Sequence, residues 1–124
     1  MEVHSDERSA TTAAFLHRAG AFFASHGVAV ERVMTDNAWS YRLSPPFQAA
    51  VRDLGARHFL IPPRRPQVNG KVERFNRTLL EEWAYVRLYR SNGARLQALN
   101  RWLEFYNSSR PHTALGGRPP ASRL

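Results

Sequence analysis

Apolar residues recur at helical spacing in the first part of the chain. Within residues 6–26 they fall at three- and four-residue steps, at Ala13, Leu16, Ala19, Phe22 and Phe23. This spacing predicts an amphipathic helix, which Gly27 ends. Residues 28–35, VAVERVMT, cluster β-branched side chains and predict a strand that stops at Asp36.

A second helix and a second strand follow. Ser44-Pro45-Pro46 is typical of a helix start, and the predicted helix runs through Leu54 to a stop at Gly55. Its apolar face contains Phe47, Val51 and Leu54. Residues 57–61, RHFLI, predict a strand that is broken by two prolines. The order helix, strand, helix, strand indicates parallel strands joined by a crossover helix.

The second half of the chain predicts helices only. Residues 62–70, PPRRPQVNG, contain three prolines and predict a loop. A long helix is predicted over residues 71–87, with an apolar stripe of Val72, Phe75, Leu79, Trp83 and Val86. Another is predicted over residues 93–107, with Leu96, Leu99, Leu103 and Tyr106 on one side. Residues 108–124 show no period and predict an extended basic tail.

The predicted sheet is small. Two strands are rarely sufficient for independent stability, and an α/β domain of this pattern should have more. We therefore expect the sequence to be the later part of a larger α/β fold.

Composition narrows the classes of function. The chain has 124 residues, 43% of them apolar, which suits one domain with a modest core. The absence of cysteine excludes disulfides, thiolate catalysis and cysteine-ligated zinc. The N-terminus is unlike a signal peptide, and no apolar run approaches the ~18 residues of a membrane helix. We expect a cytoplasmic protein with no membrane partner.

The positive charge lies in the second half. Residues 1–63 have six arginines and six acidic residues, whereas residues 64–124 have twelve basic and four acidic residues and so carry the whole net charge of +8. Such a basic half favours a polyanionic partner, most simply nucleic acid. An arginine-rich codon bias is the alternative, since 17 of the 18 basic residues are arginine.

Two carboxylates occupy positions suited to metal binding. Asp36 follows a predicted strand, at the edge where open α/β sheets bind ligands. Glu73 lies in the first turn of the helix over residues 71–87, and the intervening crossover can return the chain to the same edge. The pair could share Mg²⁺ or Mn²⁺, which prefer carboxylate and water oxygens. The alternative is that Asp36 caps a turn and Glu73 pairs with Arg77.

Polar and basic residues surround Glu73. Asn76 and Arg77 follow it by three and four positions and therefore project beside it. The approach to the helix contains Arg64, Arg65, Gln67, Asn69 and Lys71. Together with Arg74, these side chains offer donors for phosphate next to a helix N-terminus. Arg64 and Arg65 could instead be solvated loop residues.

Three motifs occur in order along the chain. They are TDNAWSY at 35–41, PPRRPQVNGKVERFNRTLLEEW at 62–83 and WLEFYNSSRPHTALGGRPP at 102–120. Together they resemble the integrase catalytic core of bacterial insertion-sequence transposases, relatives of retroviral-type integrases. The resemblance implies an RNase H-like α/β fold, here partial, with two parallel strands, about four helices and the N-terminal strands of the sheet missing.

The resemblance also implies a chemistry. Asp36 corresponds to the second Asp of the family's DDE triad and Glu73 to its Glu, so both would be catalytic and would bind metal. Such a triad holds two Mg²⁺ (or Mn²⁺) ions that activate water or a 3′-hydroxyl for in-line attack on a phosphodiester. Transposon ends and target DNA are the implied partners, with Gln67, Asn69 and Lys71 near the DNA ends. The terminal motif, with Arg110, Pro111 and His112, implies a structural or DNA-proximal role.

The sequence departs from the family pattern in three ways. The first triad Asp should lie several dozen residues before Asp36, whereas Asp6 is only 30 residues upstream and looks like a helix cap. Ala38 stands where the family usually has Gly. The N-terminal helices that bind DNA ends are absent as well.

From these observations we expect a fragment of a transposase that acts in DNA integration. Residues 1–107 would form a truncated catalytic core, inactive or severely impaired alone and binding Mg²⁺ weakly or not at all. The alternative is a non-catalytic remnant that binds DNA or other subunits. Under either interpretation the chain could form a homo-oligomer or associate with full-length transposase. We expect it at the bacterial nucleoid.

Overall fold

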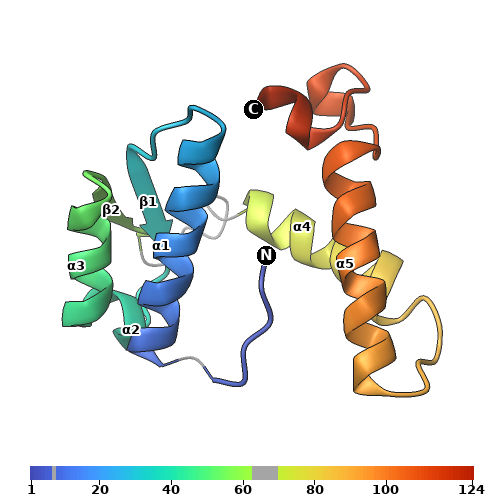
Figure 1. Ribbon diagram of the computed structural model, residues 1–124, viewed down its shortest axis with the longest axis horizontal. Coiled ribbons are helices and arrows are strands. Elements are labelled where there is room, and N and C mark those ends of the chain that lie inside the picture. Colours follow the sequence, from blue (N-terminus) through green and yellow to red (C-terminus); the bar gives the residue numbers. More distant parts are fainter. Residues whose placement is uncertain (7, 63–69) are drawn as a thin grey trace. The chain divides into compact units, whose positions relative to one another are not determined.

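The computed structural model describes residues 1–6, 8–62 and 70–124 and divides the chain into two compact units, Met1–Pro66 and Gln67–Leu124. Both strands of the described residues belong to the first unit, and the second unit is helical (Figure 1). No helix among these residues combines the length and apolar character that crossing a bilayer requires.

The first unit has a two-stranded parallel sheet. Its elements are α1 (Ser9–Ser25), β1 (Arg32–Thr35), α2 (Trp39–Arg42), α3 (Pro45–Asp53) and β2 (Arg57–Leu60). The strands pair from Arg32 opposite Arg57 to Thr35 opposite Leu60. The predicted helices and the parallel pairing are confirmed, although β1 starts four residues later than expected and the short α2 was not predicted.

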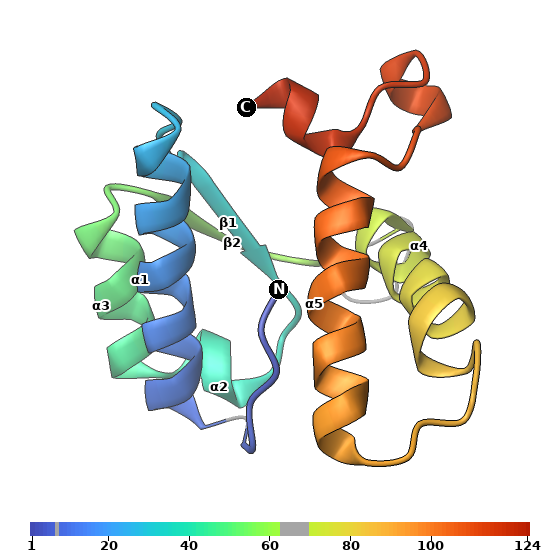
Figure 2. The ribbon, with the colours of Figure 1, turned by 45° about the vertical axis from the view of Figure 1, so that its right-hand side comes forward.

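Helices α1 and α3 lie side by side on one face of this sheet (Figure 2). The buried core is formed by Ala13, Leu16, Phe47, Ala50 and Val51, against which Val33, Tyr41, Leu54 and Ala56 pack. On the other face, the register partners Met34 and Phe59 are exposed. The alternation of side chains along each strand therefore leaves one covered and one open face.

Helices α1 and α3 both end at a glycine in the left-handed conformation. Gly55 has φ of 67°, its N–H bonds to the Arg52 carbonyl, and the Ala56 N–H bonds to the Val51 carbonyl. Gly27, with φ of 72°, ends α1 with the same pair of bonds. This is the Schellman arrangement, in which glycine avoids the Cβ penalty of a positive φ. At the other end of α3, the Ser44 hydroxyl accepts a bond from the Phe47 N–H, as an N-cap does.

The second unit consists of a broken helix packed against a long one. Its elements are α4 (Gly70–Leu79), a π-helix η2 (Leu80–Ala84), α5 (Asn92–Ser108) and two 3₁₀ turns, η3 (Thr113–Leu115) and η4 (Pro120–Arg123). The core comprises Leu79, Trp83, Ala84, Leu99 and Trp102. The loop predicted over residues 62–70 lies largely outside the described residues.

The long helix predicted over residues 71–87 ends earlier than expected. The π-turn of η2, closed by a bond from the Tyr85 N–H to the Leu80 carbonyl, brings both Trp83 and Ala84 into the core. It also leaves Val86 exposed, where an unbroken 3.6-residue period would have buried it. In α5, Trp102 is buried although it was not part of the predicted apolar side. Leu96, which was part of it, is exposed.

The C-terminal segment is folded, and the expectation of an extended tail is wrong. The His112 N–H bonds to the Arg118 carbonyl, and the Gly117 N–H bonds back to the His112 carbonyl. Gly116 and Gly117 both have positive φ, which lets the chain reverse within these few residues. Residues 108–124 therefore lack a helical or strand period because they form a compact turn. The expected domain boundary between residues 107 and 108 stays a prediction.

Candidate functional site

Asp36 is positioned by a turn at the C-terminal end of β1. Its Oδ1 atom accepts a hydrogen bond of 2.9 Å from the Ala38 N–H, and the side-chain amide of Asn37 donates to the Ile61 carbonyl at 2.9 Å. The structure therefore agrees with the alternative in which the Asp36 side chain caps a turn. Because only Oδ1 is used, Oδ2 has no hydrogen-bond partner among the described residues, and the exposed carboxylate keeps an oxygen for a ligand.

A hydrogen-bond chain supports the backbone of this turn. The Thr35 hydroxyl donates to the Asp36 carbonyl at 2.9 Å and lies 2.8 Å from His58 Nε2. The Gln48 Nε2 atom lies 2.8 Å from His58 Nδ1 and donates to the Tyr41 carbonyl at 2.9 Å. An amide nitrogen only donates, so Nδ1 accepts and Nε2 carries the proton. Each side chain in this hydrogen-bond chain has its partners when the His58 imidazole is neutral. Burial favours the same neutral form and lowers the pKa of His58.

Asp36 also lines a cavity of about 410 Å³ in the first unit, together with Glu2, His4 and Asp6. The Asp6 carboxylate accepts bonds from the Arg8 N–H and the Thr11 hydroxyl, at 3.0 and 2.6 Å. These bonds, above all the one from Thr11, lower the pKa of Asp6. The N-cap of α1 is Arg8, without a side-chain cap bond, so Asp6 orders the segment before the helix and does not cap it as expected. Within the described ranges, no three histidine or acidic side chains converge as a metal site.

Glu73 lies in the first turn of α4 and is exposed. The alternative pairing with Arg77 does not occur, because the Arg77 guanidinium binds Glu81 at 2.9 Å on the next turn. Glu82 is likewise paired, with Arg110. Of the three acidic residues on α4 and η2, Glu73 alone has no hydrogen bond or ion pair within the described part of the chain.

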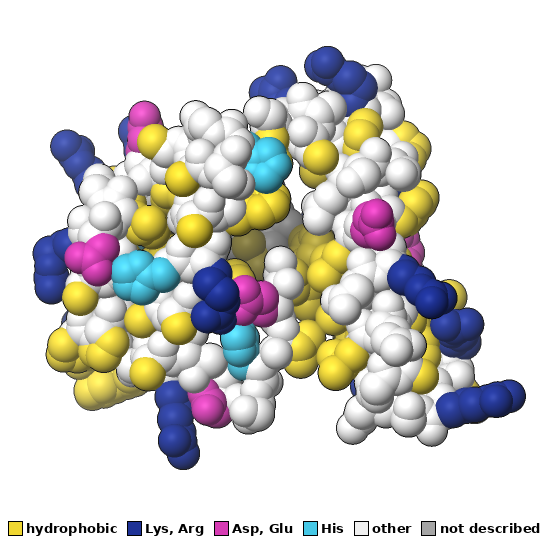
Figure 3. Space-filling model, viewed as in Figure 1, with side chains coloured by type: hydrophobic (Ala, Val, Ile, Leu, Met, Phe, Trp, Pro, Cys, Tyr) yellow, Lys and Arg dark blue, Asp and Glu magenta, His cyan; other side chains and the backbone are white. Residues whose placement is uncertain are grey.

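The basic and polar residues predicted to bind DNA fall into two groups. Lys71, Arg74, Asn76 and Arg77 are exposed on α4. Arg64, Arg65, Gln67 and Asn69 lie outside the described residues. On the face drawn in Figure 3, basic side chains are spread over each unit rather than gathered into one patch. Asp36 belongs to the first unit and Glu73 to the second, so a metal site shared by the two stays a prediction.

The terminal motif is built around an ion pair. The Arg110 guanidinium donates to Glu82 through Nε at 3.1 Å and Nη2 at 2.6 Å, and the Trp102 indole donates to the same carboxylate at 3.2 Å. These bonds, above all those from Arg110, lower the pKa of Glu82. Arg110 also lies over the Tyr106 ring, which meets the His112 ring edge-on at 4.9 Å. The arrangement supports a structural role for this motif.

Sequence reasoning missed several residues around Asp36. Thr35, Gln48 and His58 carry its supporting network, yet none was singled out. The strand RHFLI carried no signal for His58, because alternation groups it with Leu60 and groups Phe59 with Ile61, the pair that an apolar pattern turns towards a core. The structure instead half-buries His58 and leaves Phe59 exposed.

Comparison with known proteins agrees with this architecture. Residues 54–120 match the integrase core domain family. An uncharacterized 39.2 kDa protein of insertion element IS476 from Xanthomonas euvesicatoria is 33% identical over 89 residues, which is 72% of this chain and 25% of that protein. A chain in the structure of the simian T-cell lymphotropic virus intasome in complex with the PP2A regulatory subunit B56 gamma is similar with a TM-score of 0.63 and 27% identity. The similarity covers 88% of this chain and 37% of that one.

The two parallel strands with their helices fit a partial RNase H-like fold, as expected. The chain belongs to the integrase core domain family. It spans about a quarter of the length of the insertion-element relative.

Proposed function

We propose that this chain contributes Asp36 and Glu73 to a divalent-metal site that cleaves and joins DNA phosphodiesters during integration or transposition. The observation that carries the proposal is the carboxylate of Glu73, which has no partner among the described residues, on a helix surface where the neighbouring acidic residues are ion-paired. The strand-end position of Asp36, whose Oδ2 atom has no partner within residues 1–6, 8–62 and 70–124, supports it.

The donor chemistry of these residues fits Mg²⁺ or Mn²⁺. Both side chains are exposed carboxylates, and such oxygens are the ligands that these hard cations prefer. When bound, the metal supplies activation of a water or a 3′-hydroxyl and stabilises charge on the phosphate. The chain's own part is to orient the Asp36 carboxylate through the turn and to bind DNA phosphates through Lys71, Arg74 and Arg77.

A shared metal can be tested without activity. With Mn²⁺ as a paramagnetic probe, we expect selective broadening of the amide signals of Asn37 and of Val72 at the same low metal concentration. Glu73→Gln should weaken the broadening at both residues, whereas Glu104→Gln, a matched change on α5, should leave it intact. Broadening of only one of the two segments, or none, would contradict the shared site.

The isolated chain is proposed to be inactive or severely impaired. Only two carboxylates match the triad positions, and a displacement of ~1 Å at a reacting centre can cost about 10²-fold in rate. A purified sample should neither nick nor join supercoiled plasmid in Mg²⁺. Cleavage that disappears in Glu73→Gln would overturn this, and Asp6, which shares the cavity of Asp36, would then be the first candidate for a third ligand.

A second candidate function is non-catalytic binding of DNA or of another transposase subunit. The exposed basic residues of α4 favour it. Binding to duplex DNA should then be weak, indifferent to sequence and steeply dependent on salt. A filter-binding titration with equal affinity at low and high salt would reject it.

A further inference from the structure

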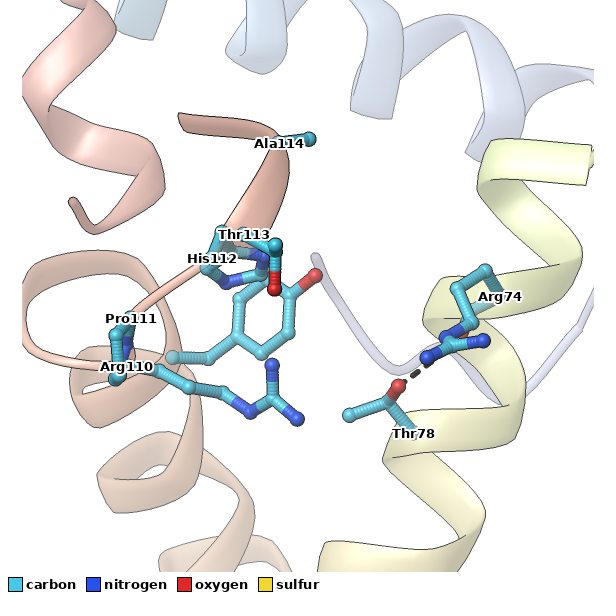
Figure 4. A pocket seen from close by; sticks show the side chains of 8 residues that line it. Arg74, Thr78, Arg110, Pro111, His112, Thr113 and Ala114 are labelled. Carbon is cyan, nitrogen blue, oxygen red and sulfur yellow. Dashed lines mark hydrogen bonds between the residues drawn. The ribbon is translucent and has the colours of Figure 1, made fainter. Parts of the chain in front are cut away.

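We infer that a pocket of the second unit binds a phosphate group, which we assign to the DNA backbone. The pocket has a volume of about 560 Å³ and lies between α4, the end of α5 and the terminal motif. Among the described residues, its lining includes Arg74, Tyr106, Arg110, His112 and Thr113 and contains no acidic residue (Figure 4). The inference deepens the proposed function, since it rests on DNA being the partner.

The first argument is the number of hydrogen-bond donors that remain available. Within the described residues, the Arg74 guanidinium has no partner, and neither do the hydroxyl groups of Tyr106 and Thr113. Glu82 accepts bonds from Nε and Nη2 of Arg110 and leaves Nη1 unused. The Thr78 hydroxyl is different, because its proton goes to the Arg74 carbonyl at 3.0 Å. Arginine, tyrosine and threonine donors of this kind are those that bind phosphate oxygens in DNA complexes.

The second argument is that one side of the pocket is already oriented. The Glu82 carboxylate holds the Arg110 guanidinium in two-pronged geometry, and the Tyr106 ring supports it at 5.6 Å. Arginine fixed in this way loses little freedom when a ligand binds. In the part of the chain that is described, the buried Nε2 atom of His112 lacks a partner. A buried polar atom requires one, but an atom this enclosed does not face the pocket, so the donors for the phosphate are the arginine and hydroxyl groups.

The third argument is size and charge. The volume falls within the range of about 300–1,000 Å³ that is typical of small-molecule sites, so it admits a phosphate with its attached sugars. Two arginines line it, and the acidic partner of one of them lies outside the lining. An oxyanion therefore enters a positive pocket.

The experiment has two arms on the full chain. In the first, the side-chain Nε–H signals of Arg74 and Arg110 are followed by NMR during titration with inorganic phosphate. We expect saturable shifts that chloride at equal ionic strength does not produce. In the second, fluorescence anisotropy measures binding to a short duplex over a range of salt.

The variants compare two arginines of equal charge, one that lines the pocket and one outside it. Arg74→Gln should weaken duplex binding about tenfold and reduce the salt slope by about one, because one phosphate contact is lost. Tyr106→Phe, which keeps the ring packing, should weaken binding about threefold. Arg101→Gln removes the same charge from exposed α5, outside the pocket, and should have less than about a twofold effect.

The outcomes separate the pocket from the proposed function. Equal effects of Arg74→Gln and Arg101→Gln, with no phosphate shifts, would overturn the inference while DNA binding stands. Phosphate shifts with equal effects on DNA would mark a site for free phosphate and contradict its assignment to the DNA backbone. Phosphate shifts without any duplex binding would support the pocket and reject the proposed DNA partner.

Discussion

The Nε2 atom of His58 lies 2.8 Å from the Oγ1 atom of Thr35 and joins the two adjacent parallel strands through their side chains. Thr35 immediately precedes Asp36, and its hydroxyl also bonds to the Asp36 carbonyl. The imidazole on β2 therefore helps to fix the backbone from which the candidate metal ligand projects.

His58→Ala should destabilise the first unit. The substitution leaves Thr35 and Gln48 without their partner, and removing one member of a part-buried network costs about 1–3 kcal/mol of unfolding free energy. A urea titration followed through NMR signals of the first unit measures the effect. Arg57→Gln, an exposed change on the same strand, should stay within about 0.5 kcal/mol. Equal effects of the two variants would count against the network.

Stability of the first unit should decrease as pH falls below neutrality. Burial lowers the pKa of His58 from its ordinary value of 6.5. Between that value and the lowered one, the unfolded chain binds a proton that the folded chain does not, so the unfolding free energy falls as pH is lowered through this window. Urea midpoints at a series of pH values test this. His58→Gln, which cannot titrate, should flatten the profile, and an unchanged profile would refute the assignment.

The two arginine–glutamate pairs of the second unit should differ in energetic weight. Arg110 and Glu82 are about two-thirds buried and share several bonds, so Arg110→Gln should cost about 1.5–3 kcal/mol. Arg77 and Glu81 are exposed, so Arg77→Gln should cost about 0.5 kcal/mol or less. Thermal unfolding followed by tryptophan fluorescence compares them. The reverse order would show that the terminal motif does not stabilise the unit.

Two glycine-to-alanine changes should have opposite signs. Gly55→Ala forces a Cβ into a left-handed residue and should destabilise the chain by about 1 kcal/mol. Gly93 lies in the first turn of α5, where an added Cβ meets the Ser91 hydroxyl at 3.8 Å and no other described atom within 4 Å. Gly93→Ala should therefore stabilise by up to about 1 kcal/mol. Urea unfolding of the two variants settles the signs, and two effects of the same sign would contradict these roles.

The sequence predicted the first unit well because its signals are local. Gly27 and Gly55 stop their helices by a conformation that few other residues adopt, and Ser44 caps the second helix. Strand pairing followed from element order alone. The short helix Trp39–Arg42 escaped because four residues are too few to display a period.

The second unit was harder to predict because tertiary contacts determine it. Trp102 is buried because its indole reaches Glu82 and its ring packs on Phe75 and Tyr106, contacts that spacing along one helix does not reveal. The pairing of Glu81 with Arg77 could be read from the sequence as easily as that of Glu73, since both are four positions from Arg77. A Glu that precedes the basic residue by four positions is the more favourable order on a helix, which favours Glu73. The structure nevertheless pairs Arg77 with Glu81, which follows it.

The π-turn at Leu80–Ala84 contains one residue more than a regular turn would need. A family member whose helix continues regularly through this segment is expected to be one residue shorter there. Aligning the two without a gap would displace every later position, so that the equivalents of Glu82 and Trp83 would be compared with the wrong neighbours. A single-residue gap between positions 80 and 84 would restore the correspondence.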